Sequence, residues 1–238
     1  MRDLRILPLA VGVNETDQGV MTYLHGYGRR ILLPIYAFVI EGARRRILVD
    51  TGLSEFRVPQ GAEEKLGFPV LGFEEALSRI GLAPGEIEII VHTHLHNDHC
   101  ENDALCPNAE IWVQRAEMAF LRRPHPVDHR YDPDLLAGLR VREIEGDVLL
   151  EEGIELLFSP GHTPGGQSVA VNTARGRAVI TGFCCNAENF PPRAPAVAPG
   201  VHLDLIEAWE TAQRIRQAAD LLIPIHDPAV GRMRRIPE

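Results

Sequence analysis

The sequence predicts an α+β fold in which two β-sheets pack against each other and helices cover their outer faces. Segments with the length and apolar spacing of strands outnumber those typical of helices. Strands and helices also arrive in two similar rounds along the chain, a pattern that favours two packed sheets. The 238 residues are 45% hydrophobic, enough for a core, and no linker interrupts them. We therefore expect a single domain over residues 1–238.

The first round begins with strands separated by turns, at residues 5–11, 34–41 and 46–50. Residues 72–81 have apolar side chains at helical spacing and end at a glycine, which predicts a helix. A short apolar strand over residues 86–91 follows. It leads directly into a histidine-rich segment.

The second round has a strand at residues 109–113 and a helix at 115–121, followed by a loop rich in proline and histidine at 124–133. Further strands are expected at residues 141–144 and 154–158. Loops of this irregular kind either line a substrate cleft or serve as plain surface connections. The proline-rich residues 189–199 leave the same two alternatives open.

The last part of the chain contains a pair of strands, at residues 167–172 and 177–181, that we expect to be joined by a tight turn. A helix over residues 203–220 and a strand over 221–225 complete the fold. Helical spacing predicts that this helix packs through one apolar face, formed by Leu203, Ile206, Trp209, Ala212 and Ala219.

Composition excludes several classes of partner. The net charge of −9, from 24 Lys and Arg against 33 Asp and Glu, repels nucleic acid and anionic membrane surfaces. No apolar run reaches the roughly 20 residues that span a bilayer, and the first residues lack the pattern of a signal peptide. We expect a cytoplasmic protein with no nucleic-acid or membrane partner, whose four cysteines stay as thiols.

Potential metal ligands cluster in the segment from Thr93 to His99. It places four metal-binding side chains within six residues, directly after an apolar strand, as His94-x-His96-x-Asp98-His99. Imidazole and carboxylate ligands suit zinc, iron or manganese, and residues on a turn at a strand end can converge on one or two ions. The segment therefore predicts a metal site.

Two further histidines have the same setting. His162 lies in the tight turn Ser159-Pro-Gly-His-Thr-Pro-Gly-Gly, and His226 follows the last predicted strand by one residue. Three separate strand ends thus present histidines that can meet at a single edge. The remaining histidines, including His92, are expected to have no metal role.

Together with Ile47-Leu-Val-Asp50-Thr-Gly, these motifs resemble the metallo-β-lactamase superfamily. The resemblance implies an αββα four-layer sandwich and a metal-dependent hydrolase, with Asp50 behind the ligands. It implies zinc, either two ions per chain or one, with iron or manganese as alternatives. The implied ligands are His94, His96 and His162 for one ion and Asp98, His99 and His226 for the other, with a bridging hydroxide.

One segment departs from the family pattern. Most hydrolytic members carry an aspartate that bridges both metals after a Thr-Gly or Ser-Gly, whereas this chain reads Thr181-Gly182-Phe183-Cys184-Cys185. Phe183 occupies the expected position. Cys184 either replaces the aspartate as a thiolate ligand or packs as a small buried side chain.

Within the superfamily the chain most resembles the N-acyl-homoserine lactonase and 4-pyridoxolactonase-like branch, through residues 34–41, Glu188-Asn-Phe and His226-Asp227. The resemblance implies a small-molecule substrate and attack of a metal-bound hydroxide on a lactone, with Asp98 protonating the leaving group. Two alternatives stay open: hydrolysis of another thioester or amide, such as a glyoxalase II substrate or a β-lactam, and a metal-binding module without catalysis. The chain is either a monomer or a homodimer.

Overall fold

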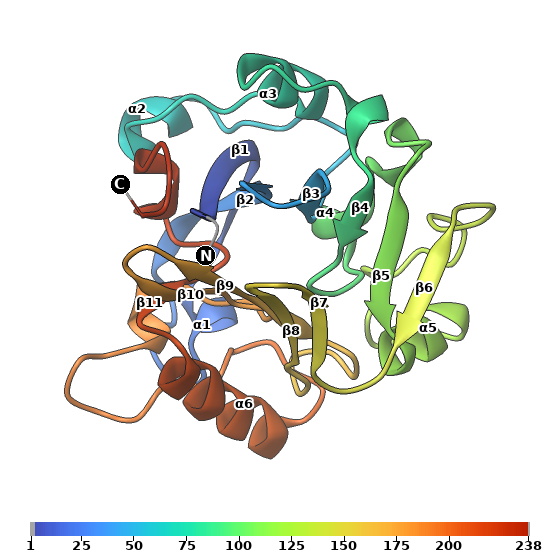
Figure 1. The fold of residues 1–238 in the computed structure, drawn as a ribbon. Helices are drawn as coiled ribbons and strands as arrows, with labels where there is room; N and C mark the ends of the chain where they lie inside the picture. Colours follow the sequence, from blue (N-terminus) through green and yellow to red (C-terminus); the bar gives the residue numbers. More distant parts are fainter. Residues whose placement is uncertain (1–2, 238) are drawn as a thin grey trace.

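The computed structural model describes residues 3–237, in which two β-sheets pack face to face and helices lie outside them (Figure 1). The first sheet has the order β1-β2-β3-β4-β5-β6 and the second the order β11-β10-β9-β8-β7. The first consists of β1 (Arg5–Asp17), β2 (Arg30–Glu41), β3 (Ile47–Val49), β4 (Ile89–Val91), β5 (Glu110–Gln114) and β6 (Val141–Ile144). The second consists of β7 (Val148–Glu151), β8 (Ile154–Phe158), β9 (Gln167–Thr173), β10 (Gly176–Ile180) and β11 (Leu221–Ile223).

The helices surround this sandwich. They are α1 (Gln18–Met21), α2 (Ala62–Leu66), α3 (Phe73–Arg79), α4 (Asn97–Cys100), α5 (Arg115–Arg122) and α6 (Leu205–Ala218), with 3₁₀ turns η1 (Pro84–Glu86), η2 (Asp103–Leu105), η3 (Ala187–Asn189) and η4 (Val230–Arg232). Figure 1 shows α3 and α6 on opposite outer sides. The layers are therefore helix, sheet, sheet and helix, as predicted from the sequence. No helix among the described residues is long and apolar enough to cross a membrane.

Strand β2 shows how the sequence builds these layers. Tyr36 and Phe38 belong to the core between the sheets, while Ile35 and Ala37 belong to the apolar cluster that also contains Phe73 of α3. Successive side chains on a strand point to opposite faces, so a strand buried on both faces is apolar at every position. This explains the continuous apolar stretch that predicted the strand.

Strand direction gathers the site at one edge. Strands β3, β4, β5 and β6 run parallel, as do β10 and β11. The carboxyl ends of parallel neighbours meet at one sheet edge, so the residues that follow β3 and β4 become neighbours, as do those that follow β10 and β11. The first histidine motif follows β4, and His226 follows β11. His162 follows β8, which runs in the same direction as β10 because both are antiparallel to β9.

Helix α6 packs differently from the prediction. Its buried residues are Ala208, Thr211, Ala212 and Ile215. Leu203, Ile206 and Trp209 of the predicted face are 41%, 67% and 45% exposed, so that prediction is wrong for them, and Ala219 is partly buried. Gly161 supplies the reason: the backbone amides of Leu203 and Asp204 donate to its carbonyl oxygen, and a Cβ there would lie 2.2 Å from the backbone nitrogen of Ala208. Because the backbones approach so closely here, the face of α6 that carries small side chains is the one that packs inward.

Other differences between prediction and structure concern short elements and the positions at which strands end. The first strand extends to Asp17, with a register shift between Ala10 and Gly12, whereas the prediction ended at residue 11. Elements β7, α1, α2 and α4 were not predicted from the sequence. These are four or five residues long, too short to show a periodic pattern.

Candidate metal centre

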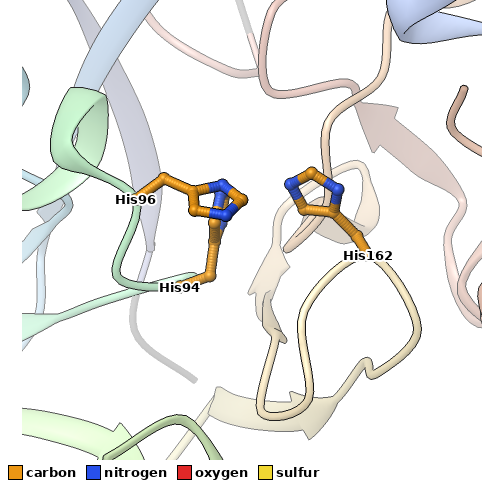
Figure 2. A group of neighbouring side chains, drawn as sticks. All are labelled: His94, His96 and His162. Atoms are coloured by element: carbon orange, nitrogen blue, oxygen red, sulfur yellow. The ribbon is translucent and has the colours of Figure 1, made fainter. Parts of the chain in front are cut away.

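The six predicted ligands lie in two groups. One ligand atom from each of His94, His96 and His162 lies within 4.8 Å of the others, and the same holds for Asp98, His99 and His226. We call these the three-histidine group and the aspartate group. Figure 2 shows His94 and His96 facing His162 across a common centre. The two groups adjoin, since the ring centroids of His94 and His99 are 4.1 Å apart.

The local fold places these side chains. Residues 92–96 lead from β4 into α4, and the amide of His99 donates to the carbonyl oxygen of His96 at 2.9 Å. At the end of β3, Asp50 has φ = 58°, a left-handed conformation that is rare outside glycine. Such backbone strain persists only where surrounding contacts enforce it. Here the amides of Thr51 and Gly52 donate to the carbonyl oxygen of His99 and tie the two strand ends together.

Each histidine has one ring nitrogen fixed by a neighbour. His162 Nδ1 donates to the carbonyl oxygen of Val201 at 2.7 Å, and His226 Nδ1 to that of Pro34 at 2.9 Å. The other pairs are His96 Nε2 with Asp128 Oδ2 at 3.0 Å, His99 Nδ1 with Asp50 Oδ2 at 2.8 Å, and His94 Nδ1 with Thr93 Oγ1 at 3.1 Å. Metal-ligating histidines are held in this way, because the outer contact fixes the tautomer and the ring orientation.

The ring nitrogens that are not held by these outer contacts are suited to bind a metal ion. His99 Nε2 and His162 Nε2 are buried and have no hydrogen-bond partner within the described part of the chain. Buried polar atoms without partners are rare in folded proteins because their desolvation is uncompensated. A cation in each group would accept these lone pairs.

The electrostatics of the three-histidine group favour neutral rings. Burial, reinforced by the neighbouring histidines, holds the pKa of His94 and of His162 well below the usual value. Burial also lowers the pKa of His96. A neutral imidazole offers its lone pair without first releasing a proton. This group is therefore prepared to bind a cation at neutral pH.

The aspartate group carries charge. Burial alone would raise the pKa of Asp98, but electrostatic interaction with the protonated forms of His99 and, next in size, His226 outweighs it and lowers that pKa. Burial would lower the pKa of His99, but Asp98 and Asp50 raise it. Burial lowers the pKa of His226 to about 4. Asp98 is thus ionised at neutral pH.

A buried chain of polar residues lies behind the aspartate group. His92 is fully buried, with Nε2 2.7 Å from Asp103 Oδ2 and Nδ1 3.3 Å from Asp50 Oδ1. Burial would lower the pKa of His92, but Asp103 and Asp50 raise it to about 10. The resulting imidazolium balances the carboxylate of Asp50, which in turn orients His99. His92 belongs to neither ligand group.

Two residues of the site were missed in the sequence. One is Asp128, which holds His96. The other is Glu117 of α5, fully buried, whose Oε1 accepts from the amide of Leu95 and the hydroxyl of Tyr131 and whose Oε2 accepts from the amide of Gly165. It ties both histidine turns to the 124–133 loop. The only sequence signal is an acidic residue within a helix, which is ordinary on an exposed face.

The strand end after β10 contributes no residue to either group. Phe183 is buried in the cluster beneath α6, with its ring centroid 6.2 Å from that of Phe190. The thiol of Cys184 is also buried and donates to Met21 Sδ at 3.5 Å. Burial, reinforced by Asp98, raises the pKa of this thiol. The geometry therefore favours packing for Cys184 over ligation.

Comparison with known proteins agrees with this geometry. The metallo-beta-lactamase superfamily model matches residues 30–182. N-acyl homoserine lactonase AiiA of Bacillus thuringiensis subsp. kurstaki is 28% identical over 213 residues, 84% of each chain. An N-acyl homoserine lactonase of Bacillus cereus is 30% identical over 181 residues, 71% of each chain.

A solved structure of an N-acyl homoserine lactone hydrolase, with the product N-hexanoyl-L-homoserine at its catalytic metal centre, has a TM-score of 0.76 and 25% identity. The alignment covers 95% of this chain and 94% of that one. Fold, family match and clustered ligands define a metal-dependent hydrolase. The chain belongs to the metallo-β-lactamase superfamily, which confirms the fold and family predicted from the sequence.

Proposed function

We propose that this protein opens small lactones, with N-acyl homoserine lactones as the first class to test. The observation that carries the proposal is the pair of adjoining ligand groups, whose histidines each have one nitrogen fixed. The relatives described above, named as lactonases, direct the choice of substrate within the hydrolases.

We propose zinc as the metal, with two ions per chain. Five imidazoles and one carboxylate suit zinc, although iron and manganese accept the same donors. The three-histidine group would hold one ion and the aspartate group the other, with Asp50 orienting His99. When bound, such ions polarise a carbonyl group and lower the pKa of bound water to about 7.

Asp98 is the proposed proton carrier. Its side chain is 18% exposed, the most open position in the aspartate group, and its lowered pKa leaves it ionised at neutral pH, so that it can accept a proton. We propose that it takes a proton from the attacking water and passes it to the ring oxygen as the carbon–oxygen bond of the lactone breaks. One water is consumed, and a hydroxy acid is released.

The test is turnover of N-hexanoyl-homoserine lactone by the zinc-loaded protein, followed by proton release. Asp98→Asn should lower kcat about 10²- to 10⁴-fold, the range of a lost acid–base group, with an unchanged circular dichroism spectrum. Asp134→Asn, an exposed position in the chain, is the matched control. Undiminished activity in Asp98→Asn would contradict this role, and an inactive wild type would favour a metal-binding module without catalysis.

Three broader predictions accompany this proposal. We propose a cytoplasmic protein that forms a single domain over residues 1–238 and acts on a small molecule without nucleic acid or membrane. The four buried cysteines, all free, support a reducing compartment. Sedimentation analysis would decide between a monomer and a homodimer.

A further inference from the structure

The 124–133 loop is fixed against the metal motif at three points. The amide of Asn97 donates to the carbonyl oxygen of Arg130 at 3.0 Å. Asp128 holds His96, and the ring of Tyr131 packs edge-on against His96 with centroids 4.9 Å apart. A loop tied in this way presents its side chains in set positions. Of the two alternatives left by the sequence, this favours a cleft wall.

Arg130 is held rigidly by Asp128. Its Nε donates to Asp128 Oδ1 and its Nη2 to Asp128 Oδ2, both at 2.7 Å, a two-pronged pair with a planar geometry. Within residues 3–237 its Nη1 makes no hydrogen bond, and the side chain is 28% exposed. The guanidinium therefore keeps one donor group open to a ligand at little cost in conformational entropy.

This guanidinium is linked to the metal motif through Asp128, whose Oδ2 accepts from Arg130 Nη2 at 2.7 Å and lies 3.0 Å from His96 Nε2. After burial, its charge is among the causes that lower the pKa of His96 and of His162. It also helps to lower the pKa of Asp98 and opposes the effect of burial on Cys184. These four residues come from three segments of the chain that converge at the centre, which agrees with the link through Asp128.

The surrounding charges determine which kind of acceptor group this N–H donor can bind. Asp128 neutralises the guanidinium, so the pair carries no net charge that would attract an anionic group. The remaining donor therefore suits a neutral acceptor, such as the carbonyl oxygen of an amide or ester.

We propose that Arg130 binds a carbonyl oxygen on the substituent of the substrate, so that the preferred substrates are lactones carrying an acyl group next to the ring. This inference rests on the proposed function, because lactone hydrolysis is what places the lactone ring at the metal centre. Arg130 would then hold the acyl substituent while the ring is opened.

The experiment compares N-hexanoyl-homoserine lactone with γ-decalactone, an alkyl lactone without the acyl carbonyl. Arg130→Met should lower kcat/KM for the acyl lactone roughly 10- to 100-fold, mainly through KM, as expected for one hydrogen bond to a charged donor. The change for γ-decalactone should stay under about threefold. Arg44→Met, which removes an exposed arginine paired with Glu152, is the control.

Two further readouts separate the alternatives. Metal content should be unchanged in Arg130→Met; a fall would show that Arg130 acts through Asp128 and His96, and would overturn the inference. Calorimetry with N-hexanoyl-homoserine lactone and metal-free protein should give about tenfold weaker binding for the variant, and equal binding would overturn the inference. Equal losses on both lactones would overturn it as well. An inactive wild type would reject lactone hydrolysis, while calorimetry would still test Arg130.

Discussion

The two halves of the metal centre differ in charge and in access. The three-histidine group consists of imidazoles whose pKa values are all lowered, each about 1% exposed. The aspartate group contains an ionised carboxylate that is 18% exposed and a histidine, His99, whose pKa is raised. The first group is a closed, neutral cage, and the second is charged and open. The difference suggests that one group anchors a cation and the other meets the substrate.

Phe183 keeps the two ligand groups separate, because its side chain cannot bridge two metal ions. It lies where the superfamily pattern predicts a bridging aspartate, and it is buried beneath α6. Under the proposed two-ion arrangement, each group would hold its ion with its own ligands and water. All three ligands of the three-histidine group are buried, whereas Asp98 of the other group is 18% exposed, so we expect the three-histidine group to bind more tightly. The aspartate group should be the weaker site.

Removal of one ligand from each half should have the largest effects. His162→Ala should lower lactone kcat/KM about 10³-fold or more and release one metal ion, because a catalytic zinc needs three protein ligands. His226→Ala should leave the ion of the three-histidine group in place. Elemental analysis and kinetics on both variants, with circular dichroism as the folding control, check this. Loss of both ions in His226→Ala would show that the halves do not act separately.

Lowering the pH should destabilise the metal-free protein. The pKa of His226 is about 4 in the folded state against 6.5 for an ordinary histidine, so between these values the unfolded chain binds more protons. The stability contributed by neutral His226 is present above pH 6.5 and lost as the pH falls toward 4, an effect of about 3 kcal/mol.

Urea unfolding of the metal-free protein at pH 7.5 and 4.5 measures this loss. In His226→Gln, which cannot titrate, the loss should be smaller by about 2 kcal/mol or more. His92, whose pKa is raised to about 10, also changes the stability between pH 7.5 and 6.5, but this contribution is the same in variant and wild type and cancels from the comparison. An identical pH dependence in variant and wild type would refute the proposed neutral state of His226.

Asp128→Asn should weaken the closed half selectively. The substitution alters the acceptor for His96 Nε2 and should lower the affinity of the tighter site about 10- to 100-fold, the usual effect of an outer contact. Competition with a zinc chelator measures both affinities, and Asp134→Asn again serves as the control. Unchanged affinity would mean that the ring of Tyr131 alone positions His96.

The smallest effect is expected for Cys184→Ala. Because the thiol packs against Met21, the substitution should lower the free energy of unfolding by about 1 kcal/mol and leave the metal content unchanged. Calorimetric unfolding and elemental analysis distinguish this from ligation. A loss of metal with little change in stability would make Cys184 the substitute for the missing aspartate.

The sequence predicted what depends on local pattern. Strands β2, β4 and β5 were visible as apolar stretches, and the six residues now found in two groups stood out because ligand types cluster at strand ends. Asp128 and Glu117 could not be predicted, because their importance comes from tertiary contacts made over long sequence separations. The buried face of α6 was misjudged because close packing against Gly161, rather than side-chain hydrophobicity, orients that helix.

The most direct test of the central claim, two separate metal sites despite Phe183, is a zinc titration of the metal-free protein combined with elemental analysis. We expect two zinc ions per chain with unequal affinities, and loss of only the weaker one in His226→Ala. A wild-type protein that binds one ion or none when zinc is in excess would contradict the account.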